Sequence, residues 1–447
     1  MRIGEWPSCN TNNAGKKLVR NSTLVLVAAL ALAGNTWFYA LHVLVPMQKA
    51  DAIAHQVPRG NLSDLYPRWL GARELLLHGR DPYSREITRE IQIGYYGRPL
   101  DANRPNDPKD QEGFAYPVYV VFLLAPTVLL PFALVEAVSR WIFIAVITAT
   151  VVLWFKALQW RVSRSAALIA VVFALGNFPA IQALALRQLS IVVAGLLGLV
   201  FFLAVRRKFL LAGLVLALAT IKPQLAIPVA SWLGLWTLGG WRERKGVVLG
   251  FLAGMAILVA SAQWILPGWI PKFYYAVLAY RKYTGGATAA DVLFGLHLGR
   301  ATNVLLVLIT GIICWQLRHK SEKSVEFIFA SCFVLAAAVA IAPIFAPYNQ
   351  LLLFPAFLAL VQHRNALLPK TLWQKLLLRV AILMICWQWI ACIFLTIIYC
   401  LISTRLVERI WAMPFYASLP LPIMVMCLLY VCFRVIRPPA SVSQNAN

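Results

Sequence analysis

Long apolar runs separated by short basic connectors recur along this chain of 447 residues. A membrane-spanning helix needs about 20 mostly apolar residues, and the first such run extends from Thr23 to Val45. Its length favours a retained helix over a cleaved signal peptide. Further spans are predicted at residues 134–158, 166–184, 189–205, 246–266, 301–317, 325–342, 348–363, 376–401 and 417–434. The pattern predicts an all-α polytopic membrane protein.

Prolines interrupt two further apolar stretches. Residues 116–132 are short for a span and contain three prolines, and residues 209–238 are broken at Lys222-Pro223. Proline removes a helical hydrogen bond, so the first stretch is either a full helix or a re-entrant segment packed against protein. The second predicts a broken helix or a hairpin that dips in from the cytoplasmic side. Together the runs predict a bundle of about ten to thirteen transmembrane or re-entrant helices.

A large polar segment, residues 46–115, follows the first span. Near its centre, apolar residues recur at spacings of four, three and four: Leu65, Trp69, Ala72 and Leu76. This single stripe predicts an amphipathic helix that lies in the membrane interface. Gly79 is a natural end for that helix, and Asp81 begins a turn rather than serving catalysis.

The chain therefore divides into one membrane domain and two tails. We expect a cytoplasmic tail at residues 1–22, a single membrane domain at residues 23–436 and a disordered tail at residues 437–447. Within the membrane domain, residues 46–115 are expected to form a large extracytoplasmic first loop.

Composition and charge support this organisation. With 61% hydrophobic and 13% charged residues, the chain does not fit a soluble globular protein. The net charge of +24 lies outside the polar loop, because residues 47–115 contain ten basic and ten acidic residues. Basic residues cluster on short connectors, as the positive-inside rule expects of cytoplasmic loops. Nucleic acid is therefore not an expected partner. The loops expected outside are 46–115, 267–300, 343–347 and 402–416.

No metal or cofactor site is predicted. None of the eight cysteines lies in the polar loop, so neither a disulfide framework nor a paired-cysteine metal site is indicated there. Asp101, Asp107 and Asp110 lack a metal-ligand spacing. Dependence on a metal ion stays open at this stage.

Asp64 stands at the head of the interfacial helix and is the leading candidate for a catalytic base. The alternative is that Asp64 or Ser63 only caps the helix, the more frequent role of such residues at a helix N-terminus. Four downstream segments place polar residues among prolines and glycines at depths where the membrane makes them costly. The presence of these segments in the same chain favours a catalytic role for Asp64.

These segments resemble the polytopic GT-C glycosyltransferases, specifically glycosyltransferase family 87, the alpha-mannosyltransferase-like group. The resemblance covers about residues 20–360. Its motifs are a Gly-x-Asp-Pro-Tyr element at Gly79 to Tyr83, Phe-x-Tyr-Pro at Phe114 to Pro117, Gln188, Ala212-Gly213 followed by Lys222-Pro223, and Pro343, Tyr348 and Pro355. Each motif alone is weak, and the series is moderately specific.

The resemblance implies a GT-C-like bundle that transfers a sugar, mannose or a related hexose, from a polyprenyl-phosphate-linked donor. The acceptor would be a lipid or glycan on the extracytoplasmic face of the inner (plasma) membrane. Asp64 would act as general base in a reaction that inverts the anomeric centre. Lys222 is the first candidate to stabilise the departing phosphate, and its alternative role is a snorkelling lysine at a helix end.

Other candidates for donor-phosphate or substrate binding have weaker support. Arg187 and Gln188 either contact substrate or only finish a helix. The late-loop position where many relatives carry a histidine is occupied by Tyr348, Asn349 and Gln350. His297, in the outer loop, is a substitute for that histidine, although a lone loop histidine is usually solvated.

Two other classes of function compete with the glycosyltransferase hypothesis. A secondary transporter or lipid flippase also contains broken helices and buried charges. However, the sequence has no second copy of the Asp64 loop, and acidic residues within its helices are few. A noncatalytic subunit of envelope glycan assembly would need no acidic residue in this loop.

Overall fold

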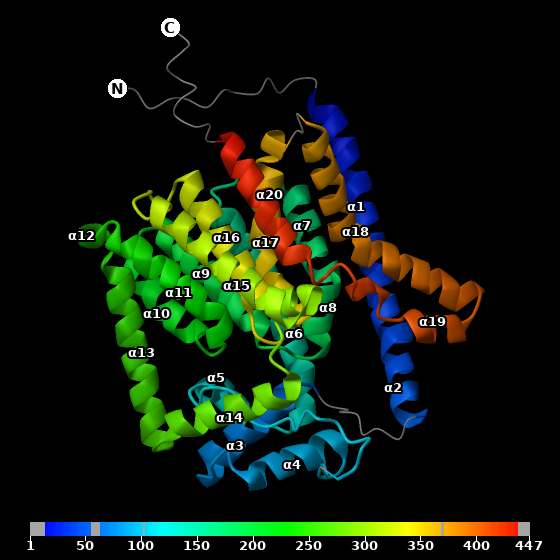
Figure 1. Ribbon diagram of the computed structural model, residues 1–447, viewed down its shortest axis with the longest axis vertical. Helices are drawn as coiled ribbons and strands as arrows, with labels where there is room; N and C mark the ends of the chain where they lie inside the picture. The colour runs from blue at the N-terminus through cyan, green and yellow to red at the C-terminus, as the bar shows by residue number, and fades with distance from the viewer. Residues whose placement is uncertain (1–13, 55–62, 102, 368–370, 437–447) are drawn as a thin grey trace.

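A computed structural model describes residues 14–54, 63–101, 103–367 and 371–436 (Figure 1). Every regular element in these ranges is a helix, which confirms the all-α expectation for the described part of the chain. The tail 437–447 and most of the tail 1–22 lie outside the described residues. The seven cysteines described are all free.

Five described helices are long and apolar enough to cross a membrane. The first runs through Thr23–Ala54 and includes α1 (Ala14–Phe38), a π-helical segment (Tyr39–Leu44) and α2 (Val45–Ala54). The other four are α6 (Phe132–Ala157), α13 (Gly246–Ile265), α15 (Ala289–Leu317) and α18 (Leu372–Leu401). The bundle is therefore membrane-embedded in character.

Shorter apolar helices complete the bundle: α9 (Ser190–Val205), α10 (Phe209–Ala219), α16 (Val325–Ile341) and α20 (Leu421–Ile436). α7 (Arg164–Gly176) and α8 (Phe178–Ala185) form a pair bent by 59°. α16 is buried on all faces through most of its length, so the core of the bundle surrounds it. The total of ten to thirteen helices stays a prediction.

Four predicted spans differ from the structure. The span predicted at residues 301–317 begins at Ala289, and the span predicted at 166–184 is divided between α7 and α8. The first helix continues to Ala54 instead of ending at Val45, because the π-helical turn before Pro46 accommodates the missing backbone N–H without ending the helix. The span predicted at residues 348–363 is divided into a 3₁₀ helix (Pro347–Leu353) and α17 (Phe354–Gln362). A proline stands in the first turn of each piece, the position that proline tolerates best.

The two proline-interrupted stretches are also resolved. Residues 116–132 contain only α5 (Val120–Leu124) and a single 3₁₀ turn (Ala125–Thr127), which favours the re-entrant alternative over a full helix. Residues 209–238 form α10 and α11 (Pro223–Leu238), with the break at Lys222. Phe209 at the start of α10 contacts Trp236 near the end of α11, with ring centres 5.8 Å apart, so the two helices fold back on each other as the hairpin alternative predicts. The side of the membrane from which this hairpin enters stays a prediction.

A polar layer covers one end of the bundle, where α3 (Leu65–His78), α4 (Arg85–Tyr96) and α14 (Trp269–Thr284) lie together (Figure 1). α3 buries the predicted stripe, except that Leu75 replaces Leu76 as its last fully buried member. Gly79 ends α3 in the left-handed conformation, with φ of 66°. The helix thus forms where the pattern predicted it, and its place in the membrane interface stays a prediction.

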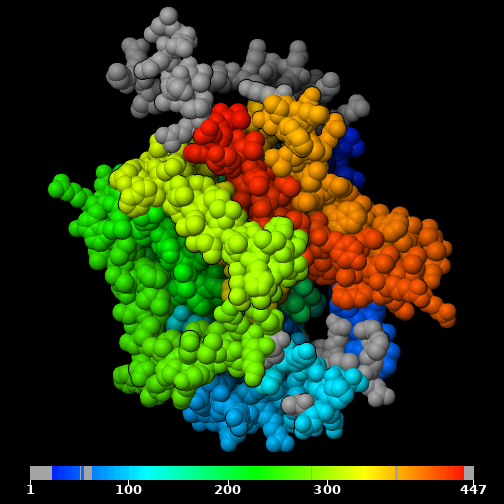
Figure 2. All heavy atoms as spheres, in the orientation of Figure 1, coloured from blue at the N-terminus to red at the C-terminus, as the bar shows by residue number. Residues whose placement is uncertain are grey.

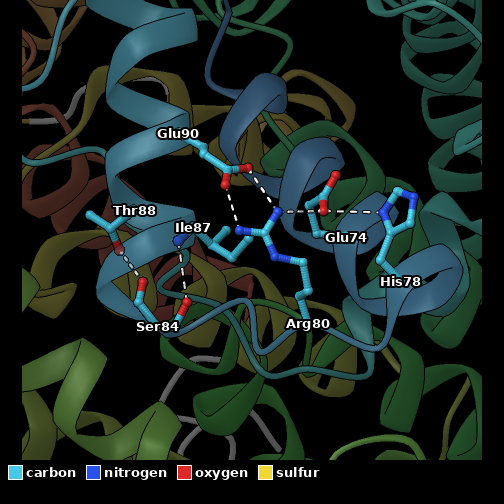
Figure 3. A network of polar contacts seen from close by, with 7 residues as sticks. All are labelled: Glu74, His78, Arg80, Ser84, Ile87, Thr88 and Glu90. Carbon is cyan, nitrogen blue, oxygen red and sulfur yellow. Dashed lines mark hydrogen bonds and ion pairs between the residues drawn. The ribbon is translucent and has the colours of Figure 1, made fainter.

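Ion pairs hold this layer together. Arg80 donates to Glu74 of α3 at 2.9 Å and to Glu90 of α4 at 2.5 Å, so one guanidinium joins the two helices (Figure 3). Asp81, in the turn between them, pairs with Lys272 of α14 at 2.8 Å. Figure 2 shows α14 lying against this layer. Asp81 therefore belongs to the turn and its anchor, as expected.

Basic connectors gather in another part of the bundle. Arg207, between α9 and α10, pairs with Glu243 of α12 (Trp241–Arg244) and with Glu322 between α15 and α16. Arg244 donates to the carbonyl oxygens of Arg318 and Lys320. These connectors form one group, as the charge pattern requires, and the side of the membrane that they face stays a prediction.

Glycines bring α10 and α13 into close contact. A Cβ added at Gly213 would collide with the backbone carbonyl of Val247, and one added at Gly250 would collide with that of Leu210. Small residues at such positions let membrane helices approach closely. Because α10 ends just before Lys222, this contact also fixes where Lys222 lies.

We expect Gly213→Ala to destabilise the protein by about 1–3 kcal/mol through overpacking, although alanine is the better helix former by about 1 kcal/mol. The matched control is Gly234→Ala on α11, where an added Cβ meets nothing within 4 Å. Thermal unfolding in detergent should give a lower Tm for Gly213→Ala alone. Equal Tm values for the two variants would contradict the proposed role of this close contact.

Candidate functional site

The Asp64 side chain does not cap α3. Asp64 occupies the N-cap position but makes no side-chain capping hydrogen bond, and the Ser63 hydroxyl is buried without a partner among the described residues. Instead, the Asp64 carboxylate accepts a hydrogen bond from Gln188 Nε2. Its backbone N–H donates to the carbonyl of Leu186 at 3.0 Å. The capping interpretation is therefore wrong, and both ends of Asp64 are bound to the turn before α9.

Gln188 connects Asp64 to the lysine at the helix break. Its Oε1 accepts a hydrogen bond from Lys222 Nζ at 2.9 Å, while its Nε2 donates to Asp64. Lys222 also donates to Ser190 Oγ at 2.7 Å, and Ser190 donates to Asn349 Oδ1 at 2.9 Å. Lys222 is only 4% exposed. A continuous polar network thus joins four segments that are far apart in the sequence.

Two aromatic rings face the buried ammonium group. Lys222 Nζ lies 5.0 Å from the centre of the Tyr348 ring and 6.0 Å from that of Tyr116. The Tyr116 ring also receives the Arg68 guanidinium, whose Cζ lies 4.9 Å from its centre. Such contacts stabilise a cation without neutralising it. Neither ring adds a negative charge that would compete with an anionic ligand for the two cations.

A residue from another segment, Tyr119, holds the break between α10 and α11 in place. Lys222 is the N-cap of α11 and Pro223 is its first residue, a position where proline's missing N–H costs little. The Tyr119 hydroxyl reaches across and donates to the carbonyl of Thr220 at 3.0 Å. The re-entrant segment therefore anchors the break and fixes Lys222 beside Gln188.

Arg187 holds the turn before α9. Its guanidinium donates to the carbonyl oxygens of Leu184 and Ala185 within its own turn and to that of Glu136 on α6. Its backbone is in the left-handed region, with φ of 51°. The side chain compensates for a turn that few residues adopt. Arg187 therefore positions Gln188 and does not join the polar network.

Two other predicted site residues also lie apart from this network. Gln350 Nε2 donates to the carbonyl of Ser418 at 2.5 Å, so its amide ties the 3₁₀ helix to the segment before α20. His297 is exposed on α15, and none of the contacts that form the network includes it. The substitute role of His297 has no geometric support here.

Arg68 and Glu112 form a second charged group beside Asp64. Arg68 Nη1 donates to the Asp64 carbonyl oxygen at 2.7 Å and lies 3.8 Å from Glu112 Oε2. Burial raises the pKa of Asp64 above its ordinary value, and the positive charges of Arg68 and Lys222 limit the rise. Burial, with help from Asp110, also raises the pKa of Glu112 to about 8. The site therefore holds a carboxylate of unusually high basicity.

The network has the parts of a group-transfer site. It offers a partly exposed carboxylate that can take a proton and, on the other side of one amide, a buried ammonium that can bind an anion. No group of three or more metal-ligating side chains occurs in the described ranges. Lys222 and Arg68 supply positive charge that can stabilise an anion at this site.

The sequence predicted five members of the site and missed three; the five are Asp64, Gln188, Lys222, Tyr348 and Asn349. Arg68 follows Asp64 by one helical turn, a spacing that puts the two on one face of α3. Tyr116 lies inside the quoted Phe-x-Tyr-Pro motif, and Ser190 lies two residues after Gln188. Each had a local signal, but only the fold shows that all three meet.

Comparison with known protein families gives one match. The model of glycosyltransferase family 87 matches residues 114–347, just over half of the chain. The chain belongs to glycosyltransferase family 87. No curated protein and no solved structure matched. Membership of this family makes the protein a glycosyltransferase and agrees with the membrane character of its helices.

The family 87 match covers only part of the network. It includes Tyr116, Gln188, Ser190 and Lys222, and it ends one residue before Tyr348. Asp64 and Arg68 precede it. The contact from Gln188 to Asp64 therefore carries the site beyond the matched region and to the start of α3.

Replacing Lys222 should separate catalysis from folding. We expect Lys222→Met to stay folded with a moderately lower Tm, because the apolar side chain removes the cost of burying a charge but leaves Gln188 Oε1 and Ser190 Oγ without their donor. Glycosyl transfer should fall by about 10²–10³, the usual effect of losing one electrostatic stabiliser. Activity and thermal unfolding are measured on the same preparation. A large drop in Tm with little loss of specific activity would instead indicate a structural lysine.

Proposed function

We propose that this family 87 enzyme transfers a sugar, mannose or a related hexose, from a polyprenyl-phosphate-linked donor to a lipid or glycan acceptor. The reaction takes place on the extracytoplasmic face of the inner (plasma) membrane and inverts the anomeric centre. Asp64 is the general base, and Lys222 stabilises the leaving phosphate. The Asp64–Gln188–Lys222 hydrogen-bond chain is the observation that carries this proposal.

The hydrogen-bond chain holds a proton acceptor, Asp64, and a cation, Lys222, at a fixed separation. Gln188 presents its N–H₂ group to the carboxylate and its oxygen to the ammonium, so each end of the amide matches the charge that it meets. Because one side chain separates the base from the anion stabiliser, the two charges do not neutralise each other by direct pairing. Such preorganised charges act on the transition state without further rearrangement.

The proposed step is a single displacement. Asp64 removes the proton from an acceptor hydroxyl while the hydroxyl oxygen attacks the anomeric carbon. The bond between that carbon and the phosphate oxygen breaks, and its electron pair leaves with the polyprenyl phosphate. The proton ends on Asp64, and the negative charge of the phosphate lies against Lys222. A phosphate leaving group needs little protonation, so one carboxylate is sufficient.

The surroundings of Lys222 support a lipid-linked phosphate donor. The ammonium is buried at a break between two apolar helices, where a lysine is costly unless it has a function. Tyr348 and Tyr116 pack around it without adding negative charge at neutral pH. A donor whose phosphate enters from the apolar side of the bundle fits this position.

The position of Asp64 supports transfer at the outer end of the bundle. It lies in the polar layer of α3, α4 and α14, apart from the group of basic connectors (Figure 1). By the positive-inside rule the basic connectors face the cytoplasm. The polar layer and its carboxylate then face outward, which is the basis for the proposed extracytoplasmic localisation.

Asp64→Asn tests the base directly. The purified enzyme is offered polyprenyl-phosphate mannose and related donors with a membrane lipid extract as acceptor source, and labelled product is counted. We expect transfer to fall by at least 10²-fold, within the range usual for loss of a general base, because asparagine retains the shape but cannot accept the proton.

The matched control is Glu408→Gln, an exposed carboxylate on α19 (Thr404–Ile410) that lies outside the Asp64 network. It should transfer sugar as the unaltered enzyme does. Equal transfer by Asp64→Asn and Glu408→Gln would contradict the proposed mechanism. Lipid movement across vesicles without any sugar transfer would support the flippase alternative instead.

The pH profile should show the raised pKa of Asp64. Because only the ionised carboxylate accepts a proton, kcat/KM should fall about tenfold per unit as the pH drops through this pKa, which burial places above 3.8. Arg68→Gln removes a positive charge that lowers the pKa, so the acidic limb should move to higher pH. Arg68→Lys should restore it. Arg68 lowers the pKa of Glu112 as well, so Glu112→Gln separates the two groups. An acidic limb that disappears in Glu112→Gln would assign the titration to Glu112.

A further inference from the structure

The tip of the outer loop folds back over α4 and encloses a pocket of about 1160 Å³. Its walls are one face of α4 and the segment 98–111, and its lining is mainly charged and polar. The pocket lies in the polar layer, outside the helices of spanning length. Its volume is slightly above the usual range for small-molecule sites, about 300–1000 Å³.

Paired side chains fix the shape of this loop. Arg98 donates two hydrogen bonds to the carboxylate of Asp107, at 2.8 and 2.5 Å. Gln92 of α4 accepts from the Leu100 N–H at 3.1 Å and donates to the Gln111 carbonyl at 3.2 Å. One glutamine therefore holds both ends of the segment against α4. The pocket is built by the fold and not by chance contacts of a loose loop.

The pocket is strongly basic. Five cationic and two anionic side chains line it: Arg85, Arg89, Arg98, Arg104, Lys109, Asp101 and Asp107. Arg98 and Arg104 pair with the two carboxylates. Arg85, Arg89 and Lys109 form no ion pair with another described residue and are exposed. Arg85 and Arg89 are four residues apart, so they project from the same face of α4.

The pocket adjoins the Asp64 site along the chain. Gln111 lines the pocket, and the next residue, Glu112, lies 3.8 Å from Arg68. Arg68 in turn donates to the Asp64 carbonyl oxygen. The Arg68–Glu112 contact therefore connects the end of the pocket wall to the residue that carries the proposed base.

We propose that this pocket binds the acceptor and that the acceptor is an anionic glycan, an oligosaccharide bearing carboxylate or phosphate groups. This inference rests on the proposed function. Arg85, Arg89 and Lys109 contact the anionic groups, and arginine can do so with two parallel hydrogen bonds. The volume admits more than one sugar unit. The hydroxyl to be glycosylated then extends past Glu112 to Asp64.

A membrane surface is the competing ligand for these cations. A helix that docks on lipid headgroups presents apolar side chains beside its basic ones. The lining between Arg85 and Arg89 is instead Thr88 and Gln92, which are polar, and the cations surround a hollow. The observations therefore favour a soluble anionic chain inserted into the pocket.

The test measures binding by the full-length enzyme in nanodiscs of neutral lipid. The probes are oligogalacturonate, an acidic oligosaccharide, and a neutral malto-oligosaccharide of the same length. We expect oligogalacturonate to bind, with an affinity that falls as salt is added, and the neutral probe to bind at least tenfold more weakly. The double variant Arg85→Gln/Arg89→Gln should lose at least tenfold in affinity for the acidic probe.

The control is Arg161→Gln/Arg164→Gln, which removes the same charge from exposed positions on the connector between α6 and α7. It should bind oligogalacturonate as the unaltered enzyme does. Equal binding of the two probes, or equal loss in both double variants, would overturn the proposal. Vesicles containing phosphatidylglycerol form a further arm. If Arg85→Gln/Arg89→Gln weakens vesicle binding but not oligogalacturonate binding, the surface docks on membranes and the acceptor proposal is wrong.

Failure of the pocket is distinguishable from failure of the proposed function. Asp64→Asn should bind oligogalacturonate normally, because Asp64 lies outside the pocket lining. Arg85→Gln/Arg89→Gln should still cleave the donor slowly with water as acceptor, since that reaction needs only Asp64 and Lys222. Normal transfer by Asp64→Asn would overturn the base while the binding result stands.

Discussion

The amide of Gln188 is the contact on which the site depends. It faces a carboxylate with its donor end and an ammonium with its acceptor end, and both hydrogen bonds lie where little water competes. Without this amide, no shared hydrogen-bonding group would hold the proposed base at the head of α3 in place relative to the cation at the break before α11. A buried polar group of this kind is costly unless fully satisfied. Side chains from different segments of the fold therefore supply the hydrogen-bond partners of this amide.

The segments that meet at this site each contain a local irregularity in helical structure. The turn before α9 has the left-handed backbone of Arg187, and α10 gives way to α11 at a proline. The late segment enters as a 3₁₀ helix instead of a span. Regular helices satisfy their own backbone and present only side chains, whereas breaks let polar groups enter an apolar bundle. The site lies where these breaks meet.

The polar layer gives the base its environment. α3 buries its apolar stripe against the re-entrant segment, while Arg80 fastens it to α4 and Lys272 fastens the turn to α14. This packing removes water from Asp64 and raises its pKa, and Arg68 limits the rise. Stability of the layer and basicity of the carboxylate therefore have the same physical origin. The adjoining basic pocket gives the same layer a second proposed role, which is to bind the acceptor.

The sequence by itself determined the helical class, most span boundaries, α3 and its end at Gly79, and the break at Lys222. These depend on apolar length, periodicity and proline or glycine chemistry, all of which are local. It also picked out Asp64, Gln188 and Lys222 as separate candidates. Only the tertiary structure decided that Asp64 does not cap its helix, that Arg187 and Gln350 serve the backbone, and that Arg68, Tyr116 and Ser190 join the site. Those outcomes depend on contacts between residues up to 159 positions apart, and spacing along one chain carries no information about which distant groups meet.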